Sequence, residues 1–237
     1  MLGILGGMGP LASAVFYEML IEQTGAETDQ ENMNFMLYNH ADMPDRTAVI
    51  LSGAKPAMDD IRSRLMQDIT LLADAGCTAV ACTCNTAHYF IDEMEKDLPI
   101  PVINLPNGAV LEAARRFPGG KVAVLATDGT NETGLFNNYL AAQGMQAVLP
   151  KPECQAKVMS VIYDYVKKAL PVPADLWQEI DSEVRELGCD CAILGCTELS
   201  VLARDAGLDL SESGFYIDAM EVLAKTCVSM FGNREGS

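Results

Sequence analysis

Cys84 and Cys196 are the residues of this chain best placed to carry chemistry. Each follows an apolar run typical of a buried strand, and each precedes a polar pair, Asn85-Thr86 or Thr197-Glu198, that can open a helix. In open α/β sheets ligands bind at the carboxyl ends of the strands, and the N-terminus of a helix lowers the pKa of a thiol placed over it. The spacing therefore predicts two thiols in a ligand site, both shifted toward the thiolate.

A pair of facing thiols suits one type of reaction. One thiolate can remove a proton from a tetrahedral carbon while the other thiol delivers a proton to the opposite face, and the product is the mirror image of the substrate. The alternative is that both are core residues, because a free cysteine behaves as a small hydrophobe. For Cys84 and Cys196 the residues alone leave the two interpretations balanced. We expect the core for the other six, which are Cys77, Cys82, Cys154, Cys189, Cys191 and Cys227.

Strands and helices that could position the thiols alternate along the chain. Helical periodicity marks 11–23 and 58–76, among others, between short apolar runs. The runs that predict strands are 2–5, 34–39, 78–84, 101–104, 121–127 and 191–196. This alternation predicts an α/β fold with a mainly parallel sheet.

Internal similarity indicates a duplicated unit. Shifting the sequence by 120 positions matches, among others, Leu5 with Leu125, and a shift of 112 brings Cys84 onto Cys196. Any two α/β segments share some similarity, but we favour a true duplication. A pseudo-two-fold axis would then place the two thiols opposite each other across a cleft between two domains.

We predict two pseudo-symmetric α/β domains, each with a mainly parallel sheet flanked by helices, and an active site in the cleft between them. The first domain comprises 1–105 together with 213–237, and the second comprises 106–212. Near 216–230 we predict a helix, whose apolar stripe must pack against the rest of the protein. Its members are Met220, Leu223, Cys227 and Met230.

Composition excludes several classes of protein. The chain has 237 residues, 49% of them hydrophobic, and its 33 Asp and Glu against 16 Lys and Arg give a formal charge of −17. It is therefore not disordered, and it lacks the clustered basic surface that nucleic-acid binding requires. The uncharged segment 1–17 has no basic leader and is interrupted by Gly and Pro before it could cross a membrane. We expect a cytoplasmic protein with neither a nucleic-acid nor a membrane partner.

Metal binding is the other role that the cysteines could have. The C-x-C pairs at 82–84 and 189–191 could bind zinc, but neither lies in a Gly-rich knuckle and no suitable histidine accompanies them. We expect no metal and reduced, buried thiols. We interpret His40 and His88 as structural, because the two thiols already fill both proton-transfer roles.

Four motifs resemble the aspartate/glutamate racemase family of cofactor-independent amino-acid racemases. They are G-G-M-G-P (6–10), D-M-P-D-R-T (42–47), A-C-T-C-N-T-A-H (81–88) and G-C-T-E-L (195–199). The resemblance implies two similar α/β domains with the C-terminal helix on the first, a catalytic cysteine from each domain, no pyridoxal phosphate or other cofactor, and often a homodimer. Glu198 stands where the cell-wall glutamate racemases have a histidine, which favours the aspartate racemase branch.

The resemblance also assigns residues to the site. It implies Cys84 and Cys196 as the catalytic pair and Arg46 as the contact for a substrate carboxylate. Lys167, or its neighbour Lys168, resembles the family's second carboxylate-binding residue. The other substrate-binding residues in this interpretation, which offer backbone, amide or hydroxyl groups, are Met8, Asn85, Thr86, Thr127 and Thr197.

Other functions remain open at this point. The segment 7–12 matches the G-x-G-x-x-A pattern of dinucleotide-binding proteins, but no acidic residue ends the next predicted strand and the pattern does not explain the cysteines. Hydantoin racemases, maleate isomerases and arylmalonate decarboxylases are similar at the cysteine motifs, and a non-catalytic protein that binds acidic amino acids is a further alternative. We favour a racemase that acts on aspartate or glutamate, aspartate first, by two-cysteine 1,1-proton transfer.

Overall fold

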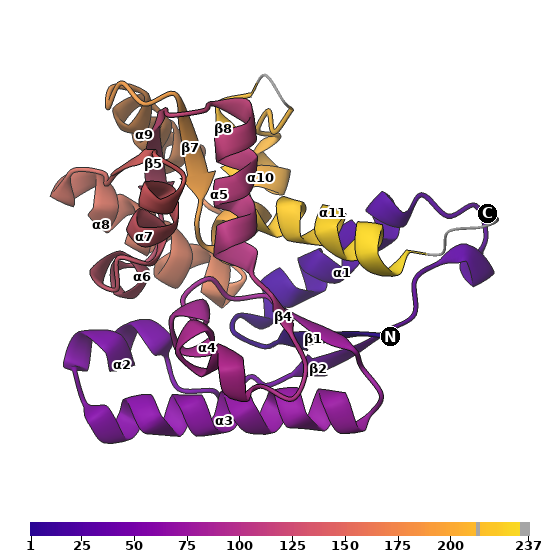
Figure 1. The fold of residues 1–237 in the computed structure, drawn as a ribbon. Helices are drawn as coiled ribbons and strands as arrows, with labels where there is room; N and C mark the ends of the chain where they lie inside the picture. The colour runs from indigo at the N-terminus through magenta and orange to yellow at the C-terminus, as the bar shows by residue number, and fades with distance from the viewer. Residues whose placement is uncertain (212–213, 233–237) are drawn as a thin grey trace.

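The computed structural model describes residues 1–211 and 214–232, in which strands and helices alternate (Figure 1). The strands are β1 (Leu2–Gly6), β2 (Phe35–Asn39), β3 (Ala79–Cys82), β4 (Val102–Ile103), β5 (Lys121–Leu125), β6 (Gln146–Val148), β7 (Cys191–Leu194) and β8 (Tyr216–Asp218). The α-helices are α1 (Pro10–Thr24), α2 (Arg46–Ser52), α3 (Lys55–Asp74), α4 (His88–Met94), α5 (Leu105–Arg116), α6 (Asp128–Glu132), α7 (Leu135–Ala142), α8 (Pro152–Ser160), α9 (Ala174–Arg185), α10 (Thr197–Ala206) and α11 (Ala219–Phe231). Shorter helical segments are η1 (Asp29–Glu31), η2 (Glu95–Asp97), the π-helical η3 (Val161–Tyr165) and the 3-10 helix η4 (Val166–Lys168).

The described strands form two four-stranded parallel sheets with equivalent strand orders, β2-β1-β3-β4 and β6-β5-β7-β8. In the centre of the first sheet Leu2 pairs with Ala79, and in the centre of the second Val122 pairs with Cys191. The same two shifts that align the sequence with itself relate these pairs, so the sheets share register as well as order. The predicted α/β fold of two similar sheets flanked by helices is confirmed.

Apolar strands and defined helix ends explain why these segments take these forms. Every residue of β1, β3 and β7 is buried, as expected for parallel strands covered on both faces. Pro10 begins α1, where its missing N–H would have no helical partner. Gly25 ends the same helix in the left-handed conformation, with φ at 63°. Because the strands of each sheet are parallel, the loops that lead from strands to helices lie at the carboxyl edge of that sheet.

Helices cover the sheets and join the two halves. Helix α3 lies on the side of the first sheet that faces away from the second (Figure 1), and it packs with β3 and α4 in one apolar cluster. A larger cluster spans both halves, because it contains Leu2 and Ile4 of β1, Val122 of β5 and Leu223 of α11. Helix α11 contacts α1, α5 and α10, and α1 also contacts α10.

The C-terminal part differs from the prediction. Helix α11 begins at Ala219 rather than near 216, because Tyr216–Asp218 forms β8 beside β7. Aromatic and β-branched residues favour a strand there, and the carboxylate of Asp218 caps the helix after it. Met230 of the predicted stripe is 57% exposed, whereas the other three members are buried. Strand β6 was not predicted.

The predicted division into 1–105 plus 213–237 and 106–212 stays a prediction. Helix α11 packs against both α1 and α5, which belong to different predicted domains. Residues 212–213 and 233–237, at the ends of these ranges, lie outside the described residues.

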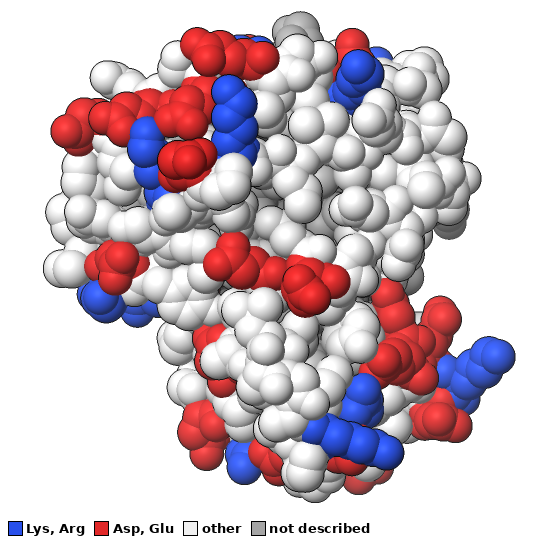
Figure 2. Space-filling model, turned by 90° about the vertical axis from the view of Figure 1, so that its left-hand side faces the viewer, with Lys and Arg blue, Asp and Glu red and all other residues white. Residues whose placement is uncertain are grey.

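The surface mixes charges of both signs. Figure 2 shows one face, on which basic side chains lie next to acidic ones rather than in one separate patch. Arg62, for example, pairs with Asp59 at 2.8 Å and with Glu93 at 2.6 Å. Within 1–211 and 214–232, no helix has both the length and the apolar character needed to cross a membrane.

Asp218 is a buried carboxyl group that links two helices. It is 2% exposed and accepts hydrogen bonds from the Ser200 hydroxyl of α10 at 2.6 Å and from the Met220 N–H of α11 at 2.8 Å. Burial raises the pKa of Asp218 from 3.8 to about 6, although both donors act in the opposite direction. The carboxyl group therefore titrates at a higher pH in the folded protein than in the unfolded chain.

We expect Asp218→Asn to remove a pH-dependent part of the stability while keeping a side chain that can cap α11. Since the folded protein binds this proton more tightly, the stabilisation is complete below about pH 4 and is lost as the pH rises through about 6. The free energy of unfolding of the wild type minus that of the variant should therefore fall between about pH 4 and pH 7 in chemical denaturation. A difference that stays constant over this range would contradict the assignment.

Candidate active site

The nine residues that the sequence predicted for the site all line one small cavity where the two sheets meet. These residues are Met8, Arg46, Cys84, Asn85, Thr86, Thr127, Lys167, Cys196 and Thr197. They follow the carboxyl ends of β1, β3, β5 and β7 or lie on α2 and η4. Four further residues complete the lining, namely Asp45, Thr47, Tyr163 and Glu198. The cavity measures about 10 Å³, which is room for at most one water molecule.

The two thiols occupy equivalent places, but the segments after them differ. Cys84 and Cys196 come two residues after β3 and β7, and they are 5% and 7% exposed. Cys196 is the N-cap residue of α10, as predicted. Cys84 instead precedes a turn in which the His88 N–H donates to the Asn85 carbonyl at 3.0 Å, and α4 begins only at His88.

The predicted lowering of the thiol pKa is wrong for Cys196. Burial, and after it the charge of Glu198, raises the pKa of this thiol well above its usual value, while Lys167 acts in the opposite direction. The cause is desolvation, which for a fully buried group outweighs the helix dipole. Of the six cysteines expected in the core, Cys189 is half-buried and the other five are buried, and all eight are free thiols.

Arg46 is a buried cation at the first position of α2. Its guanidinium is held by three backbone carbonyls, those of Met43 at 3.3 Å, Pro44 at 2.9 Å and Met8 at 3.0 Å. Its Nε finds no hydrogen-bond partner among the described residues. Burial lowers the pKa of Arg46, but the attraction of Cys84 and then of Asp45 outweighs burial and raises it. The carbonyls thus fix the guanidinium at the cavity and leave one edge open.

Lys167 reaches the cavity from an irregular helix. The π-helix η3 and the 3-10 helix η4 bring Tyr163 and Lys167 to the same side, where the Lys167 ammonium lies 5.4 Å from the centre of the Tyr163 ring. Such π-helical turns are rare and are concentrated at functional sites. Lys168 points outward, because it is 58% exposed and pairs with Asp164. Of the two neighbouring lysines, Lys167 is therefore the one at the cavity.

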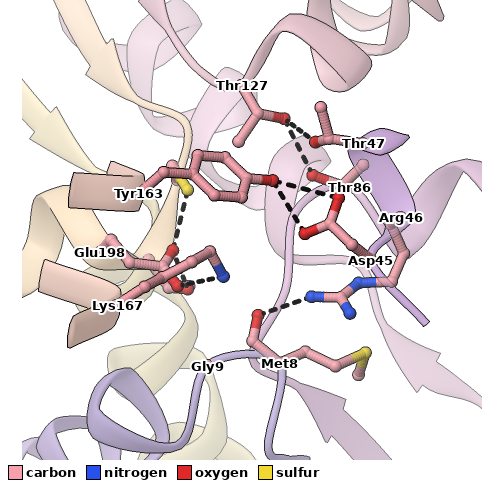
Figure 3. A network of polar contacts seen from close by, with 12 residues as sticks. Met8, Gly9, Asp45, Arg46, Thr47, Thr86, Thr127, Tyr163, Lys167 and Glu198 are labelled. Atoms are coloured by element: carbon pink, nitrogen blue, oxygen red, sulfur yellow. Dashed lines mark hydrogen bonds and ion pairs between the residues drawn. The ribbon is translucent and has the colours of Figure 1, made fainter. Parts of the chain in front are cut away.

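Glu198 connects the lysine to one of the thiols. One carboxylate oxygen lies 2.8 Å from the Lys167 ammonium, and the other accepts a hydrogen bond from the Cys196 thiol at 2.9 Å (Figure 3). Glu198 is 2% exposed. Burial lowers the pKa of Lys167, but Glu198 and then Cys196 raise it overall. From the sequence, Glu198 was expected only to help open a helix and to distinguish branches of the family. Its contacts with Cys196 and Lys167 were not predicted.

Tyr163 and Asp45 form a second link that the sequence did not predict. The Tyr163 hydroxyl donates to both oxygens of Asp45, at 3.2 and 3.0 Å, across the cavity (Figure 3). Asp45 also caps α2, accepting the Ala48 N–H at 2.7 Å. Asp45 lies inside the motif D-M-P-D-R-T, and Tyr163 lies four residues before Lys167, which is the only signal the sequence offered.

One side of the cavity is lined by threonines whose hydroxyl groups bond to one another. The Thr47 hydroxyl donates to that of Thr127 at 2.9 Å, and Thr86 bonds to Thr130 at 2.7 Å. Thr127 and Thr130 are 3.0 Å apart. Thr197 donates to the carbonyl of Thr83 at 3.3 Å, from the second half to the first. These hydroxyl contacts hold the two halves in register around the thiols.

Asn85 is the least satisfied polar residue of the lining. It is 2% exposed, yet neither its amide nitrogen nor its amide oxygen finds a hydrogen-bond partner among the described residues. A buried amide without partners costs stability, so it favours a ligand that can both donate and accept. Met8 accepts a hydrogen bond from Arg46 through its backbone carbonyl, and its contact with a substrate stays a prediction.

The two histidines hold the framework beneath the site. The ring of His88 bonds through Nδ1 to the carbonyl of Cys84 at 2.8 Å and accepts the Leu105 N–H at 3.2 Å. Burial lowers its pKa, which favours the neutral ring. His40 lies between Asp68 and Asp42, at 2.7 and 2.9 Å.

A wider pocket of about 220 Å³ adjoins the small cavity. It shares Met8, Asp45, Arg46, Lys167 and Glu198 with the cavity. The rest of its lining comes from the loop after β1, the start of α1, the loop before α2 and Val166 of η4. A ligand larger than water can reach the thiols from this pocket only if some of the shared side chains move.

The model of the family described as Asp/Glu/Hydantoin racemase matches residues 5–227. The chain belongs to this family. It is 26% identical over 242 residues to a broad specificity amino-acid racemase of Bacillus subtilis, with 98% of each chain covered. A glutamate racemase of Corynebacterium diphtheriae is 24% identical, over 65% of this chain and 57% of that protein. The structure of an aspartate racemase of Picrophilus torridus superimposes with a TM-score of 0.77 at 27% identity, covering 98% of this chain and 94% of that one.

The resemblance seen in the motifs is thus confirmed, and the protein is an isomerase of the racemase class.

The two halves of this racemase-family protein approach each other closely at Gly129. A Cβ at this position in α6 would lie 2.6 Å from the Thr47 Cα of α2, whereas a Cβ at Gly108 in α5 would have its nearest neighbour, a Val222 methyl, at 3.6 Å. Both glycines are helical, so they form a matched pair.

We expect Gly129→Ala to lower the free energy of unfolding by roughly 1–3 kcal/mol, because it forces α2 and α6 apart. Gly108→Ala should leave it unchanged or raise it by about 0.5–1 kcal/mol, as alanine does within a helix. Chemical denaturation of both variants measures the difference, and equal stabilities would show that the approach of α2 to α6 is not tight.

Proposed function

We propose that the protein is a cofactor-independent racemase that inverts the α carbon of an acidic amino acid, aspartate before glutamate. One observation carries the proposal: Cys84 and Cys196, which follow equivalent strands of two equivalent sheets, line the same cavity beside a buried Arg46. The aspartate racemase of Picrophilus torridus, which matches over nearly the whole chain, supports the choice of substrate.

The two thiols account for both proton transfers. A thiolate takes the proton from the α carbon, whose electron pair is delocalised into the substrate carboxylate. The thiol of the other cysteine then gives its proton to the opposite face, and the configuration is inverted. The first cysteine ends as a thiol and the second as a thiolate, so protons and charges balance. The pH profile should be bell-shaped, because one group must be ionised and the other protonated.

Local groups rather than net charge decide how an anionic substrate is held. The overall charge of −17 is screened within about 10 Å at ordinary ionic strength. Arg46 has an open edge for a carboxylate, and the unpartnered amide of Asn85 can bond the amino-acid end. The N-terminus of α10, with Thr197, offers further donors. Lys167 is available to a second carboxylate if the substrate displaces Glu198.

A second candidate is a racemase of broad specificity. The ion pair of Lys167 with Glu198 is already neutral, so a substrate with an uncharged side chain leaves no buried cation unpaired. The Bacillus subtilis relative supports this alternative. Rates of racemisation with aspartate, glutamate, alanine and asparagine distinguish the two candidates. Solvent deuterium incorporation at the α carbon separates either one from a protein that only binds amino acids.

We further propose a homodimer, which light scattering can test.

Replacement of either thiol should abolish racemisation. We expect Cys84→Ala and Cys196→Ala to lose activity because each removes one of the two proton-transfer groups, and the serine variants to lose about 10²–10⁴-fold or more. Circular dichroism of aspartate solutions measures the rate. Cys227→Ala, which changes a buried thiol on α11 away from the cavity, is the control for general effects on folding. Full activity in the Cys84→Ala protein would refute the mechanism.

The adjacent lysines provide a test of substrate anchoring. Lys167→Ala removes a cation at the cavity, and we expect it to lower kcat/KM for aspartate at least tenfold and for alanine much less. Lys168→Ala removes an exposed cation that pairs with Asp164, and it should leave both values unchanged. Equal effects of Lys167→Ala on aspartate and alanine would favour the broad-specificity candidate.

A further inference from the structure

Glu198 places a carboxylate against one thiol of the pair and not against the other. It is 2% exposed, its Oε2 accepts the Cys196 thiol at 2.9 Å, and its Oε1 lies 2.8 Å from the Lys167 ammonium. It sits in the first turn of α10, two residues after the cysteine that caps this helix. The carboxylate is therefore held on both sides and cannot turn away without breaking the ion pair.

A thiol and a thiolate respond in opposite ways to this carboxylate. A protonated sulfur donates a hydrogen bond to it, whereas a thiolate at the same distance would be repelled within a buried site where charges are poorly screened. The charged groups that face Cys196 are Glu198 from α10 and Lys167 from η4. Lys167 is already paired with Glu198, so it compensates only part of the repulsion.

Cys84 has the opposite surroundings at nearly the same exposure, 5% against 7%. Arg46 from α2 lies within electrostatic range of its sulfur, and Lys167 attracts it more weakly. Its other titratable neighbours are Cys82 of β3 and His88 of α4, which bonds to its carbonyl. The carboxylates of Asp45 and Glu198 line the same cavity, but they are engaged by the Tyr163 hydroxyl and the Lys167 ammonium. Arg46 is therefore the charged group that acts most directly on the Cys84 sulfur.

We infer that Glu198 assigns the resting roles of the two cysteines: it keeps the Cys196 thiol protonated, so that Cys84 is the resting thiolate and the first base. The inference rests on the proposed two-cysteine mechanism. It specifies in addition which of the two cysteines begins as the base. In the first turnover Cys84 takes the proton of the α carbon. Cys196 then gives its own thiol proton, which until then formed the hydrogen bond to Glu198. Glu198 is a positioning residue in this scheme, because it acts through Cys196. Burial and the Glu198 charge both raise the pKa of Cys196, in agreement with the geometry.

The first test is the pH profile of Glu198→Gln, which keeps the size of the side chain and an oxygen that can accept from the thiol. The basic limb of the kcat/KM profile reports loss of the Cys196 proton, and it should move to lower pH by about 1–3 units because a nearby negative charge is gone. The acidic limb, which reports Cys84, should move much less. Glu183→Gln on α9 is the matched control, since it breaks a pair with Lys157 of 2.6 Å outside the cavity.

The second test needs neither substrate nor a change at Glu198. Thiolate absorbance in the ultraviolet is measured near neutral pH for the wild type, Cys84→Ser and Cys196→Ser. We expect the signal to fall in the Cys84→Ser protein and to persist in the Cys196→Ser protein. The reverse result, or a Glu198→Gln profile that coincides with the wild type, would overturn the inference. Full racemisation by Cys84→Ala would instead overturn the two-cysteine mechanism, so the two failures are distinguishable.

Discussion

Charges buried where the carboxyl ends of the two sheets meet constrain the rest of the structure. Arg46 is 7% exposed and Glu198 is 2% exposed, and an ion this deeply buried costs several kcal/mol unless it is paired and hydrogen-bonded. Three backbone carbonyls hold the guanidinium of Arg46, while Lys167 and the Cys196 thiol hold the carboxylate of Glu198. The loops that provide these partners must therefore keep their positions, and the larger core cluster that spans both halves holds them there.

The sequence was sufficient for the parts of the molecule that periodicity and local motifs determine. The apolar runs located six of the eight described strands, and the two shifts that align the sequence with itself proved to relate the strand pairings Leu2 with Ala79 and Val122 with Cys191. All nine predicted site residues line one cavity, because parallel strands bring their carboxyl ends to one edge. Strand β8 lies where the sequence predicts helix, since its three residues are too few to show a period of their own.

The features that the sequence could not predict depend on contacts between distant segments. Whether Lys167 or Lys168 faces the cavity is decided by the π-helical turn of η3, which changes the helical phase and has no simple sequence pattern. The link from Tyr163 to Asp45 joins residues 118 positions apart. Burial, and after it the side chain of Glu198 that is paired with Lys167, raises the pKa of Cys196, whereas the helix dipole alone predicted a lower pKa.

Both the similarity of the two halves and the differences between them bear on the proposed chemistry of the site. Equal strand orders would place two equivalent thiols on two faces of a substrate, yet a symmetric pair has no preferred base. The symmetry is broken by the neighbours: a turn and Arg46 accompany Cys84, whereas a helix N-terminus and Glu198 accompany Cys196. The same side chains fill the cavity down to about 10 Å³, beside a pocket of about 220 Å³. In the proposed reaction an amino acid enters by displacing some of them, and Lys167 and Glu198, which line both spaces, then couple its binding to the surroundings of the thiols.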